Sequence, residues 1–104
     1  LLKADLRNFD EGVRAAELGF DLVSTTLSGY VEDYTEIPEG PDLDLVERLS
    51  RHLGDSPPVV AEGLISTPDQ AAEAIDRGAF CVVVGTAITR PQSLTQDFCK
   101  GMRE

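Results

Sequence analysis

The sequence predicts an α/β fold in which four parallel strands alternate with helices. Apolar segments of strand length alternate with segments whose apolar residues recur every three to four positions, the spacing of a helix. The expected strands are residues 1–6, 21–26, 59–63 and 80–85. Residues 11–26 and 70–85 also share a pattern: a small-residue helix, a glycine, and a strand that ends in small residues. Such internal repetition is typical of regular α/β architectures.

Local capping signals predict where the first and third helices begin. Asn8, with Glu11 three residues later, predicts the start of the first helix, and Gly19 predicts its end. Residues 67–70, Thr-Pro-Asp-Gln, predict the start of the third helix, because threonine caps the exposed amides and proline suits the first helical position.

The second and fourth helices are predicted from apolar spacing. The expected apolar face of the second helix consists of Leu43, Val46, Leu49 and Leu53. Pro91 opens the fourth helix, and the residues expected on its inner side are Leu94, Phe98 and Met102. The strand at residues 80–85 is nearly all apolar, which suits a parallel strand buried on both faces.

Four βα units make about half of a (β/α)8, or TIM, barrel, since a full barrel takes about 250 residues. We therefore expect one domain, residues 1–104, that is a half-barrel, and its start without Met in a strand suggests a fragment. A small open α/β sheet is the alternative that the pattern leaves open. Four parallel strands leave two open edges, which favours a homodimer or pairing with the missing half-barrel.

The composition of the chain limits the kinds of molecule that it is expected to bind. The formal net charge is −10, from 19 acidic and 9 basic residues. We expect no nucleic acid and no membrane as partner, because such a surface repels both. Cys81 and Cys99 are isolated and His52 is the only histidine, so no metal site, disulfide framework or Ser-His-Asp triad is expected. A reduced, cytoplasmic setting fits best.

Polar residues and glycines follow the apolar strands at one rim of the predicted sheet. In (β/α)8 barrels the catalytic groups lie at the carboxyl ends of the strands. The candidates at these ends are Asp5, Thr25, Thr26, Ser28, Gly29, Tyr30, Glu62, Gly63, Gly85, Thr86 and Arg90. The sequence therefore predicts a site at this rim.

Glu62 is the strongest candidate for chemistry. It follows Pro-Pro-Val-Val-Ala and precedes Gly63, so its carboxylate should lie at the tip of an apolar strand. Partial desolvation there can raise the pKa of Glu62 into the range useful for proton transfer. A structural ion pair or a helix cap is the alternative interpretation.

Gly63 and the Gly85-Thr86 turn suit the binding of an anion. Glycine lets backbone amides approach a ligand closely, and a helix that follows favours negative charge. Phosphate-binding barrels hold phosphate in the loops after their last two strands, where these glycines stand. Glycines of this kind also simply make turns.

Four further residues allow two interpretations each. Arg90 could pair with a phosphate or sugar oxygen or be solvated, and Asp5 could bind hydroxyls or cap the next turn. Tyr30, in a long loop at 27–40 whose acidic part is most simply solvated, could cover a sugar or pack at the rim. Lys3 has the strand parity of Asp5, but we expect it to be exposed at a frayed terminus, since a buried unpaired lysine is costly.

Four blocks of sequence together resemble one family. They are residues 4–6 (Ala-Asp-Leu), 17–30, which end in Thr-Thr-Leu-Ser-Gly-Tyr, 59–63 (Val-Val-Ala-Glu-Gly) and 82–91, which end in Gly-Thr-Ala-Ile-Thr-Arg-Pro. Over nearly its whole length the chain resembles the C-terminal half of the N-acetylmannosamine-6-phosphate 2-epimerases, also called N-acylglucosamine-6-phosphate 2-epimerases.

The resemblance implies a TIM barrel that interconverts N-acetylmannosamine 6-phosphate and N-acetylglucosamine 6-phosphate, without metal or cofactor, in amino-sugar and sialic-acid catabolism. Inversion at C2 removes a proton beside the latent aldehyde carbon and returns one to the opposite face. By resemblance, Glu62 is one of two proton-transfer groups. The implied sugar site contains Asp5, Ser28, Gly29, Tyr30 and Arg90, and the implied phosphate cradle contains Gly63, Gly85 and Thr86.

The chain also departs from the family pattern. The second proton-transfer group of the family, a lysine, belongs to the N-terminal half, and Lys3 and Leu64 stand where relatives usually carry an apolar and a polar residue. We therefore predict negligible epimerase activity for the chain alone. Two other interpretations remain open: a different phosphate-binding barrel, aldolase-like or thiazole-synthase-like, and a noncatalytic half-barrel that binds sugar phosphate or self-associates.

Overall fold

The structure, a computed structural model, describes residues 1–28 and 40–103. Its sheet has four strands in the order β1 (Lys3–Asp5), β2 (Leu22–Ser24), β3 (Val59–Glu62) and β4 (Cys81–Val83). Every neighbouring pair is parallel. The prediction of a parallel α/β fold built from four βα units is confirmed, although each strand is shorter than the segment expected from the sequence.

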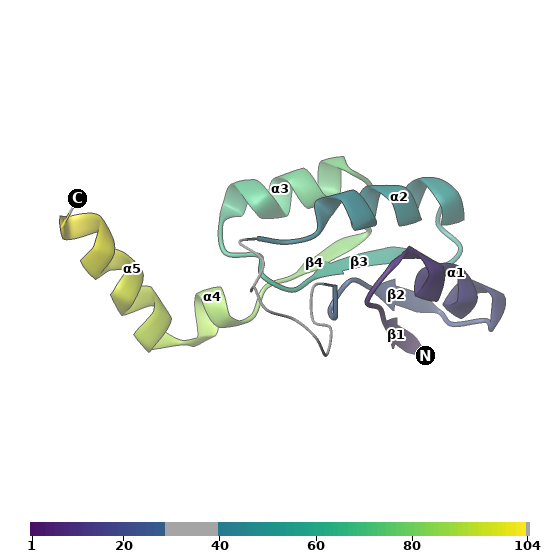
Figure 1. Cartoon of the computed structure of the whole chain (residues 1–104), viewed down its shortest axis with the longest axis horizontal. Coiled ribbons are helices and arrows are strands. Elements are labelled where there is room, and N and C mark those ends of the chain that lie inside the picture. The colour runs from purple at the N-terminus through teal and green to yellow at the C-terminus, as the bar shows by residue number, and fades with distance from the viewer. Residues whose placement is uncertain (29–39, 104) are drawn as a thin grey trace.

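A helix follows each strand. After β1 comes α1 (Phe9–Glu17), after β2 comes α2 (Leu43–Leu53), and after β3 comes α3 (Pro68–Asp76). Two helices follow β4, namely α4 (Thr86–Thr89) and α5 (Pro91–Arg103). Figure 1 shows α1, α2 and α3 gathered against one side of the sheet, while α4 and α5 lead away from it. The opposite face of the sheet carries no described helix.

The predicted caps are present. The side chain of Asn8 accepts a hydrogen bond of 2.9 Å from the amide of Glu11 at the start of α1. At the start of α3, Thr67 accepts from the Gln70 amide at 3.1 Å, and the Gln70 side chain accepts in return from the Thr67 amide. These bonds satisfy amides that lack a partner within the helix. Both helix starts are therefore determined by residues three positions apart.

The core lies between the sheet and helices α1 to α3. Leu49 of α2 and Val23 of β2 are both 0% exposed. A methyl group at Gly12 of α1 would collide with the side chain of Leu49, so the glycine allows α1 to approach α2 closely. The remaining buried apolar residues of this cluster are Leu6, Ala15, Leu45, Val46, Val59, Ala61, Ile65, Ala74 and Ala79.

Two predictions about burial are wrong. Strand β4 is not buried on both faces, because Val83 is 41% exposed and Phe80, just before the strand, is 68% exposed. The cause is the strand order, which puts β4 at an edge of a sheet that helices cover on one side. Likewise Leu94, Phe98 and Met102 of α5 are exposed rather than inside, because α5 extends away from the sheet.

Candidate active site

The alternation of side chains along the strands separates the core from the site. Ala4, Val23 and Ala61 pack among the core residues on the helix-covered face. Successive side chains of a strand point to opposite faces, so the residues beside them point to the helix-free face. The polar residues among them are Lys3 and Asp5 of β1, Ser24 of β2 and Glu62 of β3. Polar groups from three strands thus meet on one open face.

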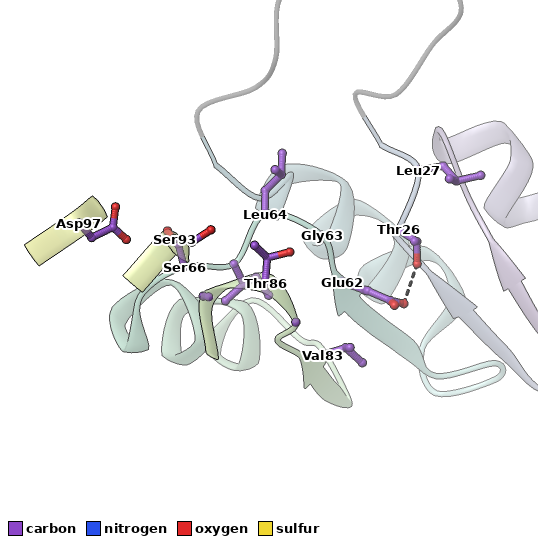
Figure 2. A pocket seen from close by; sticks show the side chains of 13 residues that line it. Thr26, Leu27, Glu62, Gly63, Leu64, Ser66, Val83, Thr86, Ser93 and Asp97 are labelled. Atoms are coloured by element: carbon purple, nitrogen blue, oxygen red, sulfur yellow. Dashed lines mark hydrogen bonds between the residues drawn. The ribbon is translucent and has the colours of Figure 1, made fainter. Parts of the chain in front are cut away.

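One carboxylate oxygen of Glu62 is the centre of this group. Its Oε2 accepts hydrogen bonds from Thr26 Oγ1 at 2.6 Å and from Ser24 Oγ at 2.8 Å. It also accepts from the Nζ atom of Lys3 at 2.9 Å. Figure 2 shows the Glu62 carboxylate turned toward Thr26. The other oxygen, Oε1, has no hydrogen-bond partner among the residues that the structure describes.

The free oxygen of Glu62 is not fully buried. Within the described part of the chain, no buried side-chain nitrogen or oxygen lacks a hydrogen-bond partner. Because Oε1 of Glu62 has none, it cannot be a buried atom, and the side chain as a whole is 22% exposed. Glu62 therefore has one oxygen that is held by three donors and one that is not fully buried and has no hydrogen-bond partner among the described residues.

The backbone of Glu62 is held as well. The hydroxyl of Thr25 accepts from the Glu62 amide at 3.2 Å and donates to the Glu62 carbonyl at 3.1 Å. Thr25 is 4% exposed, so water cannot easily replace these bonds. The end of β3 is thereby tied to the residue that follows β2, which limits the movement of the carboxylate.

The expectation that the pKa of Glu62 is raised is wrong. Partial burial is the largest single influence and does raise it, but hydrogen bonds from Thr26, Lys3 and Ser24 stabilise the anion. Together with the charge of Lys3 they hold the pKa of Glu62 below its usual range. Glu62 is therefore an anion at neutral pH.

The expectation that Lys3 is exposed is confirmed, but this end of the chain is not frayed, because Lys3 belongs to β1 and its ammonium has partners. Its ammonium lies 2.9 Å from Glu62 Oε2 and 3.4 Å from Asp5 Oδ1, and its side chain is 39% exposed. The hydrogen bond with Glu62 is the main reason that the pKa of Lys3 is raised. Lys3 thus joins two carboxylates, while Asp5 also accepts a long hydrogen bond of 3.3 Å from Thr26.

A pocket of about 640 Å³ adjoins Glu62. It brings together five of the candidates at the strand ends, Thr26, Glu62, Gly63, Gly85 and Thr86. The rest of its lining is Leu27, Leu64, Ile65, Ser66, Val83, Ala87, Ser93 and Asp97. Figure 2 shows Glu62 and Thr86 within one hollow, with Ser93 and Asp97 of α5 farther along it. The strand-end glycines and the carboxylate therefore share one cavity.

Gly63 has a conformation that other residues adopt at a cost. Its φ is +102°, and a Cβ there would lie 3.3 Å from the carbonyl oxygen of Thr26. Leu64 follows with φ of 62°, a left-handed conformation that is uncommon for a leucine. Two consecutive residues with positive φ turn the chain sharply at the edge of the pocket, directly after Glu62.

Three other predicted site residues that the structure describes, Asp5, Ser28 and Arg90, do not line this pocket. Ser28 donates a hydrogen bond to Asp42, the cap of α2. Arg90 ends α4 and Asp5 stands on β1, and neither lines the cavity. Gly29 and Tyr30 lie outside the described residues. The structure thus joins the predicted phosphate residues with Glu62 but does not bring Ser28 and Arg90 to the same cavity.

Sequence reasoning did not assign roles to the partners of Glu62. Ser24 and Thr26 are two residues apart in a segment expected to be a strand, so their hydroxyls should lie on the same face. This spacing could have identified them as neighbours of the site. Ser93 and Asp97 gave no local signal, because their place at the pocket depends on where α5 lies. Within the described residues no group of His, Cys, Asp or Glu could hold a metal ion. None of the described helices is long and apolar enough to span a membrane.

A carboxylate on the open face of a parallel sheet, beside a pocket at the carboxyl ends of the strands, defines an α/β protein of the (β/α)-barrel class. The chain belongs to the NanE family, described as "Putative N-acetylmannosamine-6-phosphate epimerase", whose profile matches residues 1–104. The resemblance inferred from the motifs is therefore confirmed, and the family is one of epimerases, which are isomerases.

Individual relatives agree with this assignment. A protein of Caldanaerobacter subterraneus subsp. tengcongensis named "Putative N-acetylmannosamine-6-phosphate 2-epimerase" is 51% identical over all of this chain and 43% of its own length. One of the same name from Clostridioides difficile is 48% identical over 98% of this chain and 44% of its own length. The solved N-acetylmannosamine-6-phosphate 2-epimerase of Clostridium perfringens superposes with a TM-score of 0.85 and 45% identity, covering 96% of this chain and 42% of that one. The chain spans less than half of the length of these relatives.

Proposed function

We propose that the protein containing this chain inverts C2 of N-acetylmannosamine 6-phosphate to give N-acetylglucosamine 6-phosphate, with Glu62 as one of two proton-transfer groups. The observation that carries the proposal is the free oxygen of Glu62 beside the pocket. Oε2 is held by Thr26, Ser24 and Lys3, so Oε1 is the atom available to a substrate.

The charge state of Glu62 suits the role of base. Glu62 is ionised at neutral pH, which is the state a proton acceptor needs, although its lowered pKa makes it a weaker base than an ordinary glutamate. In the open-chain sugar, loss of the C2 proton gives an enolate-like species conjugated with the C1 carbonyl. Return of a proton to the opposite face then inverts the centre, which requires a second group on that face.

The rest of the pocket suits a phosphorylated sugar. Gly63, Gly85 and Thr86 line the cavity that Glu62 adjoins, and the turn at Gly63 is sharp enough to bring backbone close to a ligand. The hydroxyls of Ser66 and Ser93 add donors. We assign the phosphate to this glycine-lined end and the C1–C2 part of the sugar to the end at Glu62. Asp5, Ser28, Gly29, Tyr30 and Arg90 remain proposed sugar contacts by family resemblance.

The test is a comparison of Glu62→Gln with unchanged protein. We would assay N-acetylmannosamine 6-phosphate in D₂O by ¹H NMR, which follows both turnover and exchange of the C2 proton. Because the chain spans only part of its relatives, the assay uses the chain alone and the chain joined to the unmatched portion of the Clostridium perfringens enzyme. Glu17→Gln, an exposed carboxylate on α1, is the matched control.

We expect negligible turnover by the chain alone and measurable turnover by the joined protein. Glu62→Gln should lower the turnover and the exchange about 100-fold or more, the usual contribution of a general base, while Glu17→Gln should leave both unchanged. Turnover of the joined Glu62→Gln protein at the rate of the unchanged protein would refute the role of Glu62. Substantial turnover by the chain alone would refute the need for further βα units.

We also propose that the open edges of the sheet, β1 and β4, pair with further βα units, either in a second copy or in the missing half of a barrel. Exposed Phe80 beside β4 supports this. Analytical ultracentrifugation would detect the homodimer, and a strictly monomeric chain would exclude it. The proposed setting is sialic-acid and amino-sugar catabolism in the cytoplasm, where the exposed free thiols of Cys81 and Cys99 would stay reduced.

A further inference from the structure

The side chain of Lys3 reaches Glu62 across an intervening strand. It stands on β1 and Glu62 on β3, with β2 between them. Strands of a sheet lie about 4.8 Å apart, so these two backbones are separated by roughly 10 Å. The bridge of 2.9 Å between Nζ and Oε2 forms because a long lysine and a long carboxylate extend toward one another over the open face.

Three donors meet on one oxygen, and they are not equivalent. Ser24 and Thr26 each have a single hydroxyl proton, and each has an alternative acceptor. Their hydroxyls lie 2.6 Å from each other, and Thr26 is also within 3.3 Å of Asp5. Two protons cannot serve all these contacts at once, so the hydroxyls alone do not determine which carboxylate oxygen is held. Lys3 has three protons and a full charge, enough for Glu62 and Asp5 together.

We propose that Lys3 is a positioning residue that holds Oε2 of Glu62 against β2, so that Oε1 is presented to the pocket as the proton acceptor. This inference rests on the proposed function, since it supplies the orientation of the group that takes the C2 proton. Lys3 does not itself line the pocket; the lining residue that it contacts is Glu62. It acts on the substrate through Glu62.

Two other roles for Lys3 fit the geometry less well. A proton-transferring lysine needs a neutral form near neutral pH, but the carboxylates of Glu62 and Asp5 raise the pKa of Lys3 and keep it charged. A purely structural ion pair is also a weak explanation, because the Lys3 side chain is 39% exposed and such pairs contribute little to stability. The contact between Lys3 and Glu62 is better explained by its effect on the direction in which the Glu62 carboxylate points.

The experiment is a site-resolved pH titration of the Glu62 carboxyl by NMR in protein labelled with ¹³C at glutamate, assigned with Glu62→Gln. It needs no turnover, so it separates this inference from the proposed function. The variants are Lys3→Met, which keeps the length without the charge, and Lys3→Arg, which restores a cation. Lys100→Met on the exposed side of α5 is the matched control.

We expect Lys3→Met to raise the titration midpoint of Glu62 by about half a pH unit or more, as loss of a neighbouring opposite charge does. Lys3→Arg should restore most of the shift, and Lys100→Met should change nothing. In the joined protein, Lys3→Met should lower kcat with little change in KM, since the carboxylate would be misdirected while the phosphate contacts remain.

A Glu62 midpoint that is the same in Lys3→Met and unchanged protein, with both folded by their amide spectra, would overturn the proposal. If Lys3→Met does not fold, Lys3→Gln provides the same comparison. Absence of turnover in every joined protein, together with the expected NMR shifts, would refute the proposed function but leave the Lys3–Glu62 contact established.

Discussion

Ser24→Ala tests whether the hydroxyls of β2 stabilise an anionic Glu62. Ser24 is 0% exposed, and its Oγ donates to Glu62 Oε2 at 2.8 Å. The substitution removes one oxygen atom and creates almost no cavity. Its main effect is therefore the loss of a hydrogen bond to a charged group.

The expected magnitude follows from the geometry. A hydrogen bond to a charged group contributes about 1.5–3 kcal/mol, and Glu62 keeps two other donors, Thr26 and Lys3. We therefore expect Ser24→Ala to lower the free energy of unfolding by about 1.5 kcal/mol near neutral pH, the lower end of that range.

The change of this cost with pH shows whether Ser24 stabilises the ionised form of Glu62. The pKa of Glu62 is lower in the folded protein than its ordinary value of 4.5, so ionised Glu62 stabilises the fold. That stability is fully present above the ordinary pKa and is lost as the pH falls through the folded pKa. Once Glu62 is protonated, Ser24 contacts only a neutral group. The cost of Ser24→Ala should then shrink to about 1 kcal/mol or less.

Urea unfolding followed by circular dichroism, from about pH 8 down to pH 3, measures this cost. Ser50→Ala is the matched control, because the Ser50 hydroxyl donates to the neutral carbonyl of Gly78 at 3.0 Å. Its cost should be about 1 kcal/mol at every pH. If Ser24→Ala costs the same at the two ends of the range, the hydroxyl does not stabilise the anion and the explanation of the lowered Glu62 pKa fails.

Two further predictions concern the fold that supports the site. Leu49→Ala should lower the free energy of unfolding by about 2–5 kcal/mol, since Leu49 is 0% exposed and fills the space above Gly12; urea unfolding measures it, and a loss below about 1 kcal/mol would mean that the core relaxes around the gap. Thr67→Ala should cost about 1 kcal/mol by removing the N-cap of α3. Thr67→Ser, which keeps the hydroxyl, should recover most of that loss, and an equal loss in both variants would contradict the capping explanation.

Local structure and the identity of the main candidate residue were predictable from the sequence. The caps at Asn8 and Thr67 involve partners three residues away, and the apolar face of α2 repeats within one helix. The place of Glu62 at a strand end follows from the apolar residues before it and the glycine after it. In each case the determining interactions lie within a few residues along the chain.

The environment of Glu62 was decided only by the tertiary structure. Its partners Thr26 and Lys3 are 36 and 59 residues away along the chain, in the turn after β2 and on β1. Burial at a strand tip predicts a raised pKa, and only the register of the sheet shows that three donors reverse it. The exposure of β4 and α5 was also decided only by the tertiary structure, because it depends on which other elements cover them. The sequence by itself determines contacts between near neighbours, whereas charge state and burial result from distant segments brought together by the fold.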